Sequence, residues 1–423
     1  MSENTSKIAA VTAAAAAAAA AFWWHAFGRR GAPKDAIGAP VSGLRTPAYL
    51  LYLDVATRNA DRMLARAERL GCALRPHVKT HKTLEGGVLQ TGGTRRRIVV
   101  STLREAQFFA NGGFDDILYA VPITPDKLAD AAALTLQLDA FHIMVDNAEQ
   151  LRHVLRAAPP SRAKPWSVVL MVDCGYHRDG VDPDDPASLE LVRSICDADT
   201  AVFAGIYTHG GHSYDCGSAA EIRDVAVVER DSVVRFSRQI RAAGFPCGMC
   251  GIGSTPTCSH PPEDGLDGVN EMHPGNYFVY DVVQADSIRS CRREDVATRV
   301  LTRVIGHYPA SNMLLIDLGW TGCSAQGAAT GYGAFEGHPE LRIEALKQEA
   351  GEVTCAVEGQ ALDFSRYPIG TMLRLMPYHA CAAGAMHPKV HVVDRRQRPE
   401  GEGGEEGEES VAAVWRSCRG WEL

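Results

Sequence analysis

The stretch SVVLMVD, Ser167–Asp173, is apolar at nearly every position and then ends in a carboxylate. A strand of this kind is typical of a parallel sheet that helices cover on both faces. Seven similar runs bring the expected strands to eight: Ala73–Val78, Ile98–Ser101, Ile117–Val121, Phe141–Val145, Ser167–Val172, Val202–Thr208, Gly248–Gly253 and Glu271–Tyr277. Helical patterns separate them, at Leu103–Asn111, Asp126–Leu138, Asn147–Ala157, Ala187–Asp197 and Ala219–Ala243.

Regular alternation of strands and helices indicates a parallel α/β sheet. Eight such units over roughly 220 residues fit a closed (β/α)₈ barrel. A doubly wound open sheet is the alternative, but no GxGxxG follows an early strand. We therefore expect residues 56–290 to form a barrel.

The pattern changes after the barrel, and residues 41–55 and 291–423 together predict an all-β domain. Its expected strands are short, alternating and without long helices between them: Thr46–Asp54, Thr298–His307, Met313–Asp317, Met372–Leu375, Lys389–Val393 and Val411–Trp415. Residues 395–410 contain the insert GEGGEEGEE, which cannot bury apolar surface, so we expect a disordered acidic loop there.

Residues 1–40 stand apart from both domains. Ile8–Phe27 is rich in alanine, approaches the length of a membrane span and is followed by Arg29, Arg30 and Lys34. Tethering to a membrane, targeting to an organelle and low-complexity sequence without a role remain open for it. In the tethered case the basic flank would leave the rest of the chain facing the cytosol, and we expect a cytoplasmic protein.

Charge and cysteine content exclude other classes of protein. The net charge of -8 argues against nucleic-acid binding, which needs a basic face. The 12 cysteines are scattered, which favours reduced thiols rather than a disulfide framework. Cys247 and Cys250 form a CxxC, but no second matching pair follows, so a zinc site there is disfavoured.

Polar residues follow the expected barrel strands at the rim where barrel enzymes carry their chemistry. They are Lys79, Ser101, Asp173, His209, Ser254 and the group His273–Asn276. Lys79 lies in RPHVKTHK, Arg75–Lys82, among two histidines and another lysine. Cationic neighbours lower the pKa of a lysine, as an amine that bonds to a carbonyl requires. A solvated basic turn is the alternative interpretation of this segment.

The segment PHVKTHKTLEGG, Pro76–Gly87, resembles the cofactor-lysine motif of the eukaryotic-type D-serine dehydratases and the related D-threonine aldolases. The resemblance continues in order through STLREAQFFANGGFDDIL, GIGSTPTCSHP, MHPGNYFVYD, RVLTRVIGH, GHPELR and PYHACAAGAMHP, and spans about Arg45 to Trp421. The loop GYHRDG, Gly175–Gly180, leans towards the aldolase form, so the substrate within the family stays open.

This resemblance implies an alanine-racemase-like barrel plus a β domain (fold type III of the pyridoxal-phosphate enzymes), paired as a homodimer. It implies that Lys79 carries pyridoxal 5'-phosphate and removes the α-proton of a D-amino acid. It also places Arg178 near the phenolic oxygen of the cofactor and Tyr207 near its pyridine ring, with Tyr214 on the following flexible stretch.

A phosphate site is expected after the last two barrel strands. Gly253-Ser254-Thr255 offers a small-residue turn with backbone N–H groups and hydroxyls, and barrel phosphate sites commonly lie after strands seven and eight. Gly275, Asn276 and Tyr280 would complete it from the eighth strand.

His379 and Cys381 are the candidate metal ligands. If this segment is a strand, side chains two apart face the same side, and one nitrogen with one sulfur suits Zn²⁺. A buried pair without metal is the alternative for a bare HxC, but within PYHAC the pair resembles the zinc ligands of the dehydratases.

The implied reaction is the conversion of D-serine to pyruvate and ammonia, in which zinc assists departure of the β-hydroxyl. D-Threonine aldolase, or another lyase of D-3-hydroxyamino acids, is the nearest alternative. An amino-acid racemase and a non-catalytic cofactor-binding barrel are more distant ones, because neither explains both Lys79 and the HxC pair.

Overall fold

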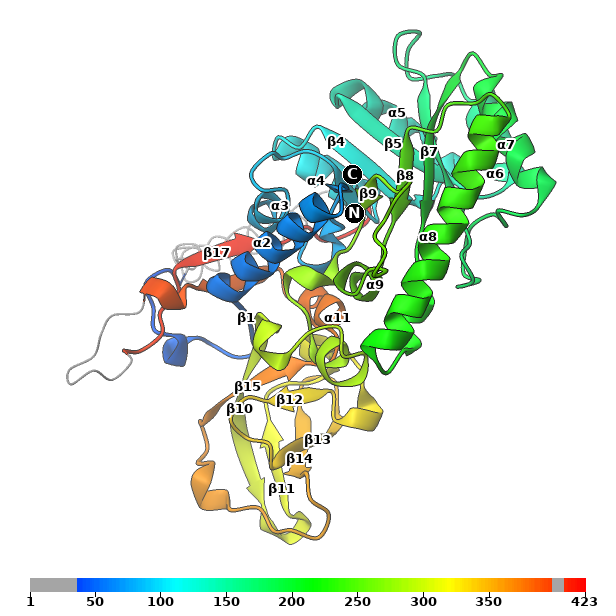
Figure 1. Ribbon diagram of the computed structural model, residues 1–423. Helices are drawn as coiled ribbons and strands as arrows, with labels where there is room; N and C mark the ends of the chain where they lie inside the picture. Colours follow the sequence, from blue (N-terminus) through cyan, green and yellow to red (C-terminus); the bar gives the residue numbers. More distant parts are fainter. Residues whose placement is uncertain (1–35, 398–406) are drawn as a thin grey trace, which may run out of the picture.

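A computed structural model describes residues 36–397 and 407–423 of the chain. It contains a barrel and a β domain, which lie at the upper right and at the bottom of Figure 1. The alanine-rich segment 8–27 and the centre of the acidic insert lie outside the described residues, so the predictions made for them stay predictions.

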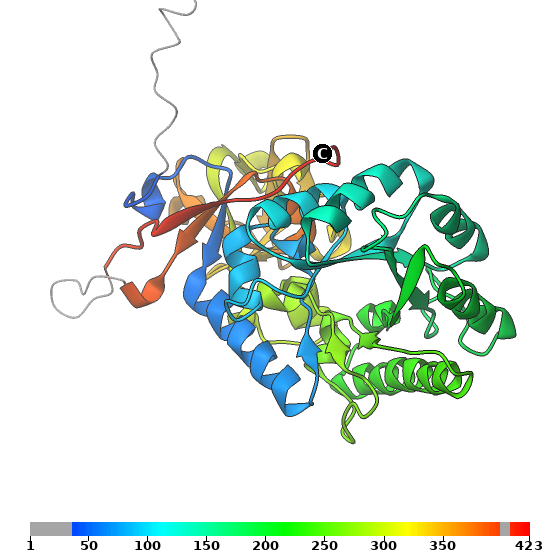
Figure 2. The same ribbon diagram turned by 90° about the horizontal axis from the view of Figure 1, so that it is seen from above.

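The barrel is a parallel sheet of eight strands in the order β2-β9-β8-β7-β6-β5-β4-β3, which confirms the predicted fold class. Its strands are β2 (Ala73–Leu74), β3 (Ile98–Val100), β4 (Asp116–Pro122), β5 (Ala140–Val145), β6 (Trp166–Val172), β7 (Ala201–Thr208), β8 (Met249–Ile252) and β9 (Glu271–Met272). A parallel bridge between His77 and Val99 joins the two end strands. The view from above in Figure 2 shows the barrel beside the β domain.

Helices cover the outside of the barrel. They are α2 (Leu53–Arg69), α3 (Leu84–Gln90), α4 (Leu103–Asn111), α5 (Leu128–Gln137), α6 (Ala148–Arg156), α7 (Pro186–Cys196), α8 (Ala219–Ala242) and α9 (Thr255–Ser259). Thr102, Asn147 and Ser218 cap three of them by accepting hydrogen bonds from N–H groups of the first turn. One core lies between strands and helices, and a smaller one that includes Val169 and Met171 forms a separate cluster of strand residues.

Two of the predicted strands are too long. The strands expected at Ala73–Val78 and Glu271–Tyr277 keep only two residues each, β2 and β9. Each then meets a proline, Pro76 or Pro274, which has no N–H for the ladder. The chain after Pro76 instead forms a 3₁₀ turn, Val78–Thr80, and this turn carries Lys79.

The β domain contains a second sheet built mostly of antiparallel strands. Its elements are β1 (Ala48–Tyr52), β10 (Thr298–Tyr308), β11 (Met313–Ile316), α10 (Trp320–Cys323), β12 (Gly333–Phe335), β13 (Leu341–Leu346), β14 (Gly351–Cys355), β15 (Met372–Pro377), α11 (Ala380–Ala385), β16 (Lys389–Val393) and β17 (Ala413–Arg416). Strand β1, from the start of the described chain, pairs with β10 and β16. Helix α11 lies between this sheet and the barrel (Figure 1).

Three further features of the described residues concern the acidic insert, a membrane-spanning helix and the CxxC cysteines. The ends of the acidic insert are structured, because Arg395–Gln397 form a 3₁₀ turn, Arg395 binds Asp54 at 2.8 Å, and Ser410 bridges to Pro40. Over residues 36–397 and 407–423, no helix is long and apolar enough to cross a membrane. The same residues contain no group of three or more His, Cys, Asp or Glu that could hold a metal, so Cys247 and Cys250 are buried free thiols.

Candidate active site

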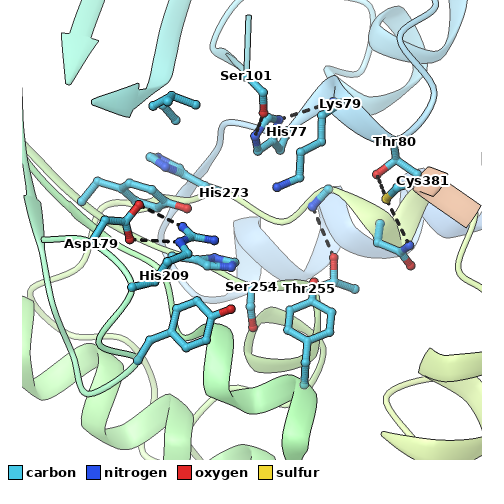
Figure 3. Close-up of a pocket in the computed structure, with 18 of the residues that line it drawn as sticks. His77, Lys79, Thr80, Ser101, Asp179, His209, Ser254, Thr255, His273 and Cys381 are labelled. Atoms are coloured by element: carbon cyan, nitrogen blue, oxygen red, sulfur yellow. Dashed lines mark hydrogen bonds and ion pairs between the residues drawn. The ribbon is translucent and has the colours of Figure 1, made fainter. Parts of the chain in front are cut away.

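A cavity of about 460 Å³ opens at the carboxyl ends of the barrel strands, where the β domain meets them. This volume lies within the range of small-molecule sites. The residues that line it come from both domains: His77, Lys79, Thr80, Ser101, Ala120, Val121, Pro122, Met171, Tyr176, Arg178, Asp179, Tyr207, His209, Tyr214, Ser254, Thr255, His273, Gly275, Asn276, His379 and Cys381. Figure 3 draws most of them.

Lys79 extends into the space that histidines and Cys381 surround (Figure 3). Lys79 is exposed to solvent through the cavity, although the protein atoms around its amine bury it in part. This burial lowers the pKa of the Lys79 amine, and Arg178 adds to the decrease, while Cys381 opposes it. The amine is therefore more readily uncharged than an ordinary lysine, as a nucleophile or base requires.

Two neutral histidines flank Lys79. His77 Nδ1 accepts the backbone N–H of Lys79 at 3.4 Å, so its Nε2 carries the proton and donates to Ser101 at 3.1 Å. His209 Nδ1 donates to the carbonyl of Gly253. Burial and then the charge of Lys79 lower the pKa of His77 well below its ordinary range and that of His209 to about 3. Neither ring therefore competes with Lys79 for positive charge at neutral pH.

His273 is a third neutral histidine that lines the cavity. Its Nε2 donates to Glu271 at 3.1 Å, and Arg75 binds the same carboxylate at 2.7 Å. Burial lowers the pKa of His273, although Glu271 opposes this. Its ring stacks on that of Tyr207, with centroids 4.5 Å apart. His273 thus supports the tyrosine that forms part of the cavity wall.

Arg178 lies on the loop after β6, at the side of the cavity. Its guanidinium stacks over Tyr176 at 5.1 Å and makes two hydrogen bonds of 3.2 Å to Asp179. Asp173, at the end of β6, accepts the N–H groups of Gly175 and His177. Asp173 therefore shapes the loop that presents Arg178, and it does not line the cavity.

The expected phosphate site is partly assembled in the structure. Ser254 and Thr255 line the cavity beside Gly275 and Asn276. The Thr255 hydroxyl accepts the N–H of Gly275 at 3.3 Å, and Asn276 Oδ1 is buried without a partner in the described chain. These contacts tie the end of β8 to the end of β9, and they leave polar groups facing one small region.

Two of the residues expected at the phosphate site lie elsewhere. The N–H of Gly253 donates to the buried Glu229 at 3.1 Å, so it is not available to a ligand. Tyr280 is buried behind the cavity wall, where its hydroxyl contacts Ser259 at 3.1 Å. Tyr207 and Tyr214 do line the cavity.

The HxC pair lies at the start of α11 and not in a strand, so the condition on which the pairing was argued is not met. β15 ends at Pro377, which cannot continue the ladder, and His379 is the N-cap residue of α11. The two side chains still lie together at the cavity wall, and each shifts the pKa of the other. Cys381 Sγ also contacts Thr80 Oγ1 at 3.2 Å, beside Lys79.

Each member of the pair favours the charged form of the other, imidazolium for His379 and thiolate for Cys381. Burial alone would lower the pKa of His379, but the bond to Cys381 and its charge raise it to about 9. Burial alone would raise the pKa of Cys381, but His379 lowers it. The thiolate is the form of cysteine that binds metals. His379 Nδ1 also contacts Gln326 Oε1 at 2.5 Å.

Two family models match the chain in the order of its domains. The model described as "Alanine racemase, N-terminal domain" matches residues 51–281, and the model described as "Putative serine dehydratase domain" matches residues 297–393. The first covers the barrel and the second covers most of the β domain, including the HxC pair.

Curated relatives match over nearly their whole length. The chain is 38% identical to the D-serine dehydratase of Dictyostelium discoideum, over 84% of this chain and 94% of the relative. It is 35% identical to the D-threo-3-hydroxyaspartate dehydratase of Delftia sp. (strain HT23), over 82% of this chain and 93% of the relative. It is 28% identical to a D-threonine aldolase of Arthrobacter sp, over 84% of this chain and 91% of the relative.

The solved structure of the Delftia dehydratase superposes with a TM-score of 0.81, at 32% identity, over 90% of this chain and 100% of that one. A histidine-to-alanine variant and a cysteine-to-alanine variant of that enzyme have also been solved, and the second is titled the metal-free form. The substituted positions lie two residues apart, as do His379 and Cys381.

Proposed function

The chain belongs to the D-serine dehydratase family, and from this premise we propose that it is a pyridoxal-phosphate- and zinc-dependent lyase that converts D-serine to pyruvate and ammonia. The observation that carries the proposal is one cavity lined both by Lys79 and by the pair His379 and Cys381. An amine with a lowered pKa and a cysteine–histidine pair, whose thiol also has a lowered pKa, would supply a base and a metal site at the same place.

The residues present suit pyridoxal 5'-phosphate. Lys79 would hold it, because its accessible amine has a lowered pKa. Ser254 and Thr255 would meet its phosphate with their hydroxyls, while Arg178 and Tyr207 would flank its ring. The free Asn276 Oδ1 accepts hydrogen bonds, as phosphate oxygens do, and the Asn276 NH₂ group already donates to Asp281, so Asn276 is not assigned to the phosphate. Gly275 also leaves necessary room, since a Cβ atom there would lie 2.9 Å from the carbonyl of His77. When bound, the cofactor supplies an electron sink for charge at the α-carbon.

Lys79 is the residue that we assign to the α-proton. Its Nζ, whose uncharged form is more accessible than that of an ordinary lysine because the pKa is lowered, can accept the proton from the α-carbon of D-serine. The neutral rings of His77 and His209 keep additional positive charge away from that amine. Enclosure by both domains limits access of water to the reacting atoms.

His379 and Cys381 are the residues that we assign to zinc. Nitrogen and sulfur are suitable donors, and in the described chain no third His, Cys, Asp or Glu joins them, which leaves positions for water and substrate. Zinc held there supplies Lewis-acid stabilisation of the oxygen that leaves the β-carbon. The metal-free title of the Delftia cysteine variant supports a role for this thiol in metal binding.

The assembly and location of the enzyme are also proposals. We infer a homodimer, as in the family, for which the exposed Trp320 and Met386 near the domain junction offer apolar contact area. Sedimentation equilibrium that gives a monomer would contradict this. We place the enzyme in the cytoplasm because all twelve cysteines are free thiols, which suits a reducing compartment.

The products distinguish the proposed reaction from its alternatives. The purified protein is incubated with D-serine, L-serine, D-threonine and D-threo-3-hydroxyaspartate, and pyruvate, 2-oxobutyrate, oxaloacetate and glycine are measured. We expect pyruvate from D-serine, with the highest kcat/KM of the four, and none from L-serine. Glycine and acetaldehyde as the main products from D-threonine would make the enzyme an aldolase.

A further inference from the structure

Asp281 is a buried carboxylate at the point where the chain leaves the barrel for the β domain. Its Oδ2 accepts the backbone N–H of Ala380 at 2.9 Å and the side-chain amide of Asn276 at 2.8 Å. Its Oδ1 accepts the backbone N–H of Gln284 at 3.1 Å. All three contacts need an acceptor, which a carboxylate provides on both oxygens.

The groups that Asp281 holds lie on either side of the metal pair. Ala380 is the residue between His379 and Cys381, and its N–H is engaged by Asp281. The Asn276 amide that Asp281 binds also lies 3.7 Å from Cys381 Sγ. One carboxylate therefore connects the peptide that separates the two ligands with a cavity residue of the barrel.

We propose that Asp281 is a positioning residue that fixes His379 and Cys381 against the barrel in the arrangement that binds zinc. This inference rests on the proposed function and deepens it, because it assigns the support of the metal site. We do not assign Asp281 as a ligand, because its oxygens accept three N–H donors and, in the described chain, it forms no metal-binding group with His379 and Cys381. Residues that orient metal ligands in this way commonly affect metal affinity strongly.

A purely structural role is the competing explanation. The adjacent bond from Val283 N–H to the carbonyl of Tyr378, at 3.1 Å, also joins the two domains. If Asp281 only stabilised this junction, its loss would lower the melting temperature without a specific change in zinc affinity. Zinc affinity therefore separates the two roles.

The direct test is Asp281→Asn in the full-length protein. An amide offers one oxygen, so its NH₂ group must face either Gln284 N–H or the two donors at Oδ2. We expect zinc to bind at least about 10-fold more weakly, as measured by competition with a chromogenic chelator. The cofactor absorbance should be retained, because Asp281 does not line the cavity.

Asp295→Asn is the matched control. Asp295 is a second buried carboxylate that accepts a backbone N–H, from Arg292 at 3.1 Å, and it lies outside the cavity lining. We expect this variant to lose stability but to bind zinc as tightly as the wild type.

Ala380→Pro is a second variant, which removes the N–H donor and leaves Asp281 unchanged. Ala380 is the first residue of α11, where proline is tolerated, and His379 has the extended φ and ψ of -131° and 108° that suit a residue before proline. We expect a loss of zinc affinity like that of Asp281→Asn, although no charged group has changed.

The outcomes show whether the zinc assignment itself fails or only the role proposed for Asp281. Wild-type zinc affinity in Asp281→Asn or Ala380→Pro overturns the inference, and so does an equal loss in Asp295→Asn, which would indicate a general effect of stability. Cys381→Ala is measured in parallel. If zinc binding by the wild type does not depend on Cys381, the metal assignment of the proposed function fails. If it depends on Cys381 but not on Asp281, only the present inference fails.

Discussion

Lys79 and Lys82 are three residues apart in one basic segment, but they have different surroundings. Lys79 lines the cavity, whereas Lys82 pairs with Glu105 at 2.7 Å. We predict that Lys79→Ala loses the cofactor absorbance and turnover falls by on the order of 10⁴-fold, because nucleophile and base are removed together. Lys82→Ala should keep the absorbance. Both are measured by absorbance spectroscopy and pyruvate release.

Borohydride reduction of the native enzyme, followed by peptide mapping, checks the same assignment without a mutation. We expect the modified peptide to contain the cofactor on Lys79. An adduct on Lys82 would show that the pairing with Glu105 does not exist in the working enzyme.

Glu229 gives a pH prediction. Its Oε1 accepts the N–H groups of Gly210 and Gly253, and burial raises its pKa from the ordinary 4.5 of a glutamate to about 7. Between these values the folded state binds more protons than the unfolded state, so the free energy of unfolding decreases as pH rises from about 4.5 to 7. The expected contribution is about 3 kcal/mol.

Glu229→Gln should remove this contribution, because an amide does not titrate in that range. Denaturant unfolding between pH 4.5 and 7.5 measures it as the difference between the wild type and the variant. A difference that stays constant with pH would show that Glu229 does not change protonation on unfolding.

Individual site residues were only partly predictable from the sequence. Lys79 follows from its motif, but His77 and His273 were noted without any assigned role. Their significance depends on which ring nitrogen bonds to which partner, such as Ser101 or Glu271, and sequence does not contain that information. Tyr280 was expected at the phosphate site, but its side chain is buried in the core, although Gly275 and Asn276 close to it in sequence line the cavity.

At the level of elements, the side chains of the HxC pair lie together as expected, but not because they share one side of a strand. A strand would place residues two apart on one side, but Pro377 ends β15 and the alanine-rich run Ala380–Ala385 forms α11. The two side chains meet at the helix N-terminus instead. The period of so short an apolar segment does not distinguish strand from helix.

The junction of β9 with the turn that carries Lys79 allows an element-level prediction. A Cβ at Gly275 would lie 2.9 Å from the backbone carbonyl of His77, so Gly275→Ala must displace that turn. We expect weaker cofactor binding and a loss of about 1–3 kcal/mol of stability. Cofactor titration by absorbance and thermal unfolding measure the two effects.

Gly217→Ala is the control for this substitution, because the nearest atom to its Cβ would be 3.9 Å away, on the side chain of Glu221. It should bind the cofactor as the wild type does. If Gly275→Ala also binds normally, the two segments are less tightly packed than the structure indicates.

At the level of the whole molecule, the fold class was predictable because eight apolar runs alternate with helical patterns. The strands of the β domain were harder to predict. β12, β13 and β14 were not predicted, since strands of a small, half-exposed sheet have short and weak patterns. The rim of the barrel was predictable as the place of the site, but the contribution of His379 and Cys381 depends on where α11 meets that rim.

The amino terminus gives a prediction for the complete chain. Residues 1–35 contain no proposed site residue, so we expect their deletion to leave kcat/KM within a few-fold and the melting temperature unchanged. Deletion to residue 44 removes Val41 and Leu44, which are buried in the β domain. That longer deletion should cost about 3 kcal/mol or more of stability. A shorter deletion that unfolds the protein would show that residues 1–35 pack against the enzyme.

The central claim is that one cavity combines a base, Lys79, with a metal site, His379 and Cys381, that assists departure of the hydroxyl group. The most direct measurement compares D-serine with D-β-chloroalanine before and after chelation, because chloride needs no Lewis acid to leave. We predict that the chelated enzyme keeps its cofactor absorbance and still releases pyruvate from D-β-chloroalanine, while pyruvate from D-serine falls by at least about 100-fold. Equal loss of both reactions in a folded, cofactor-loaded enzyme would contradict the account.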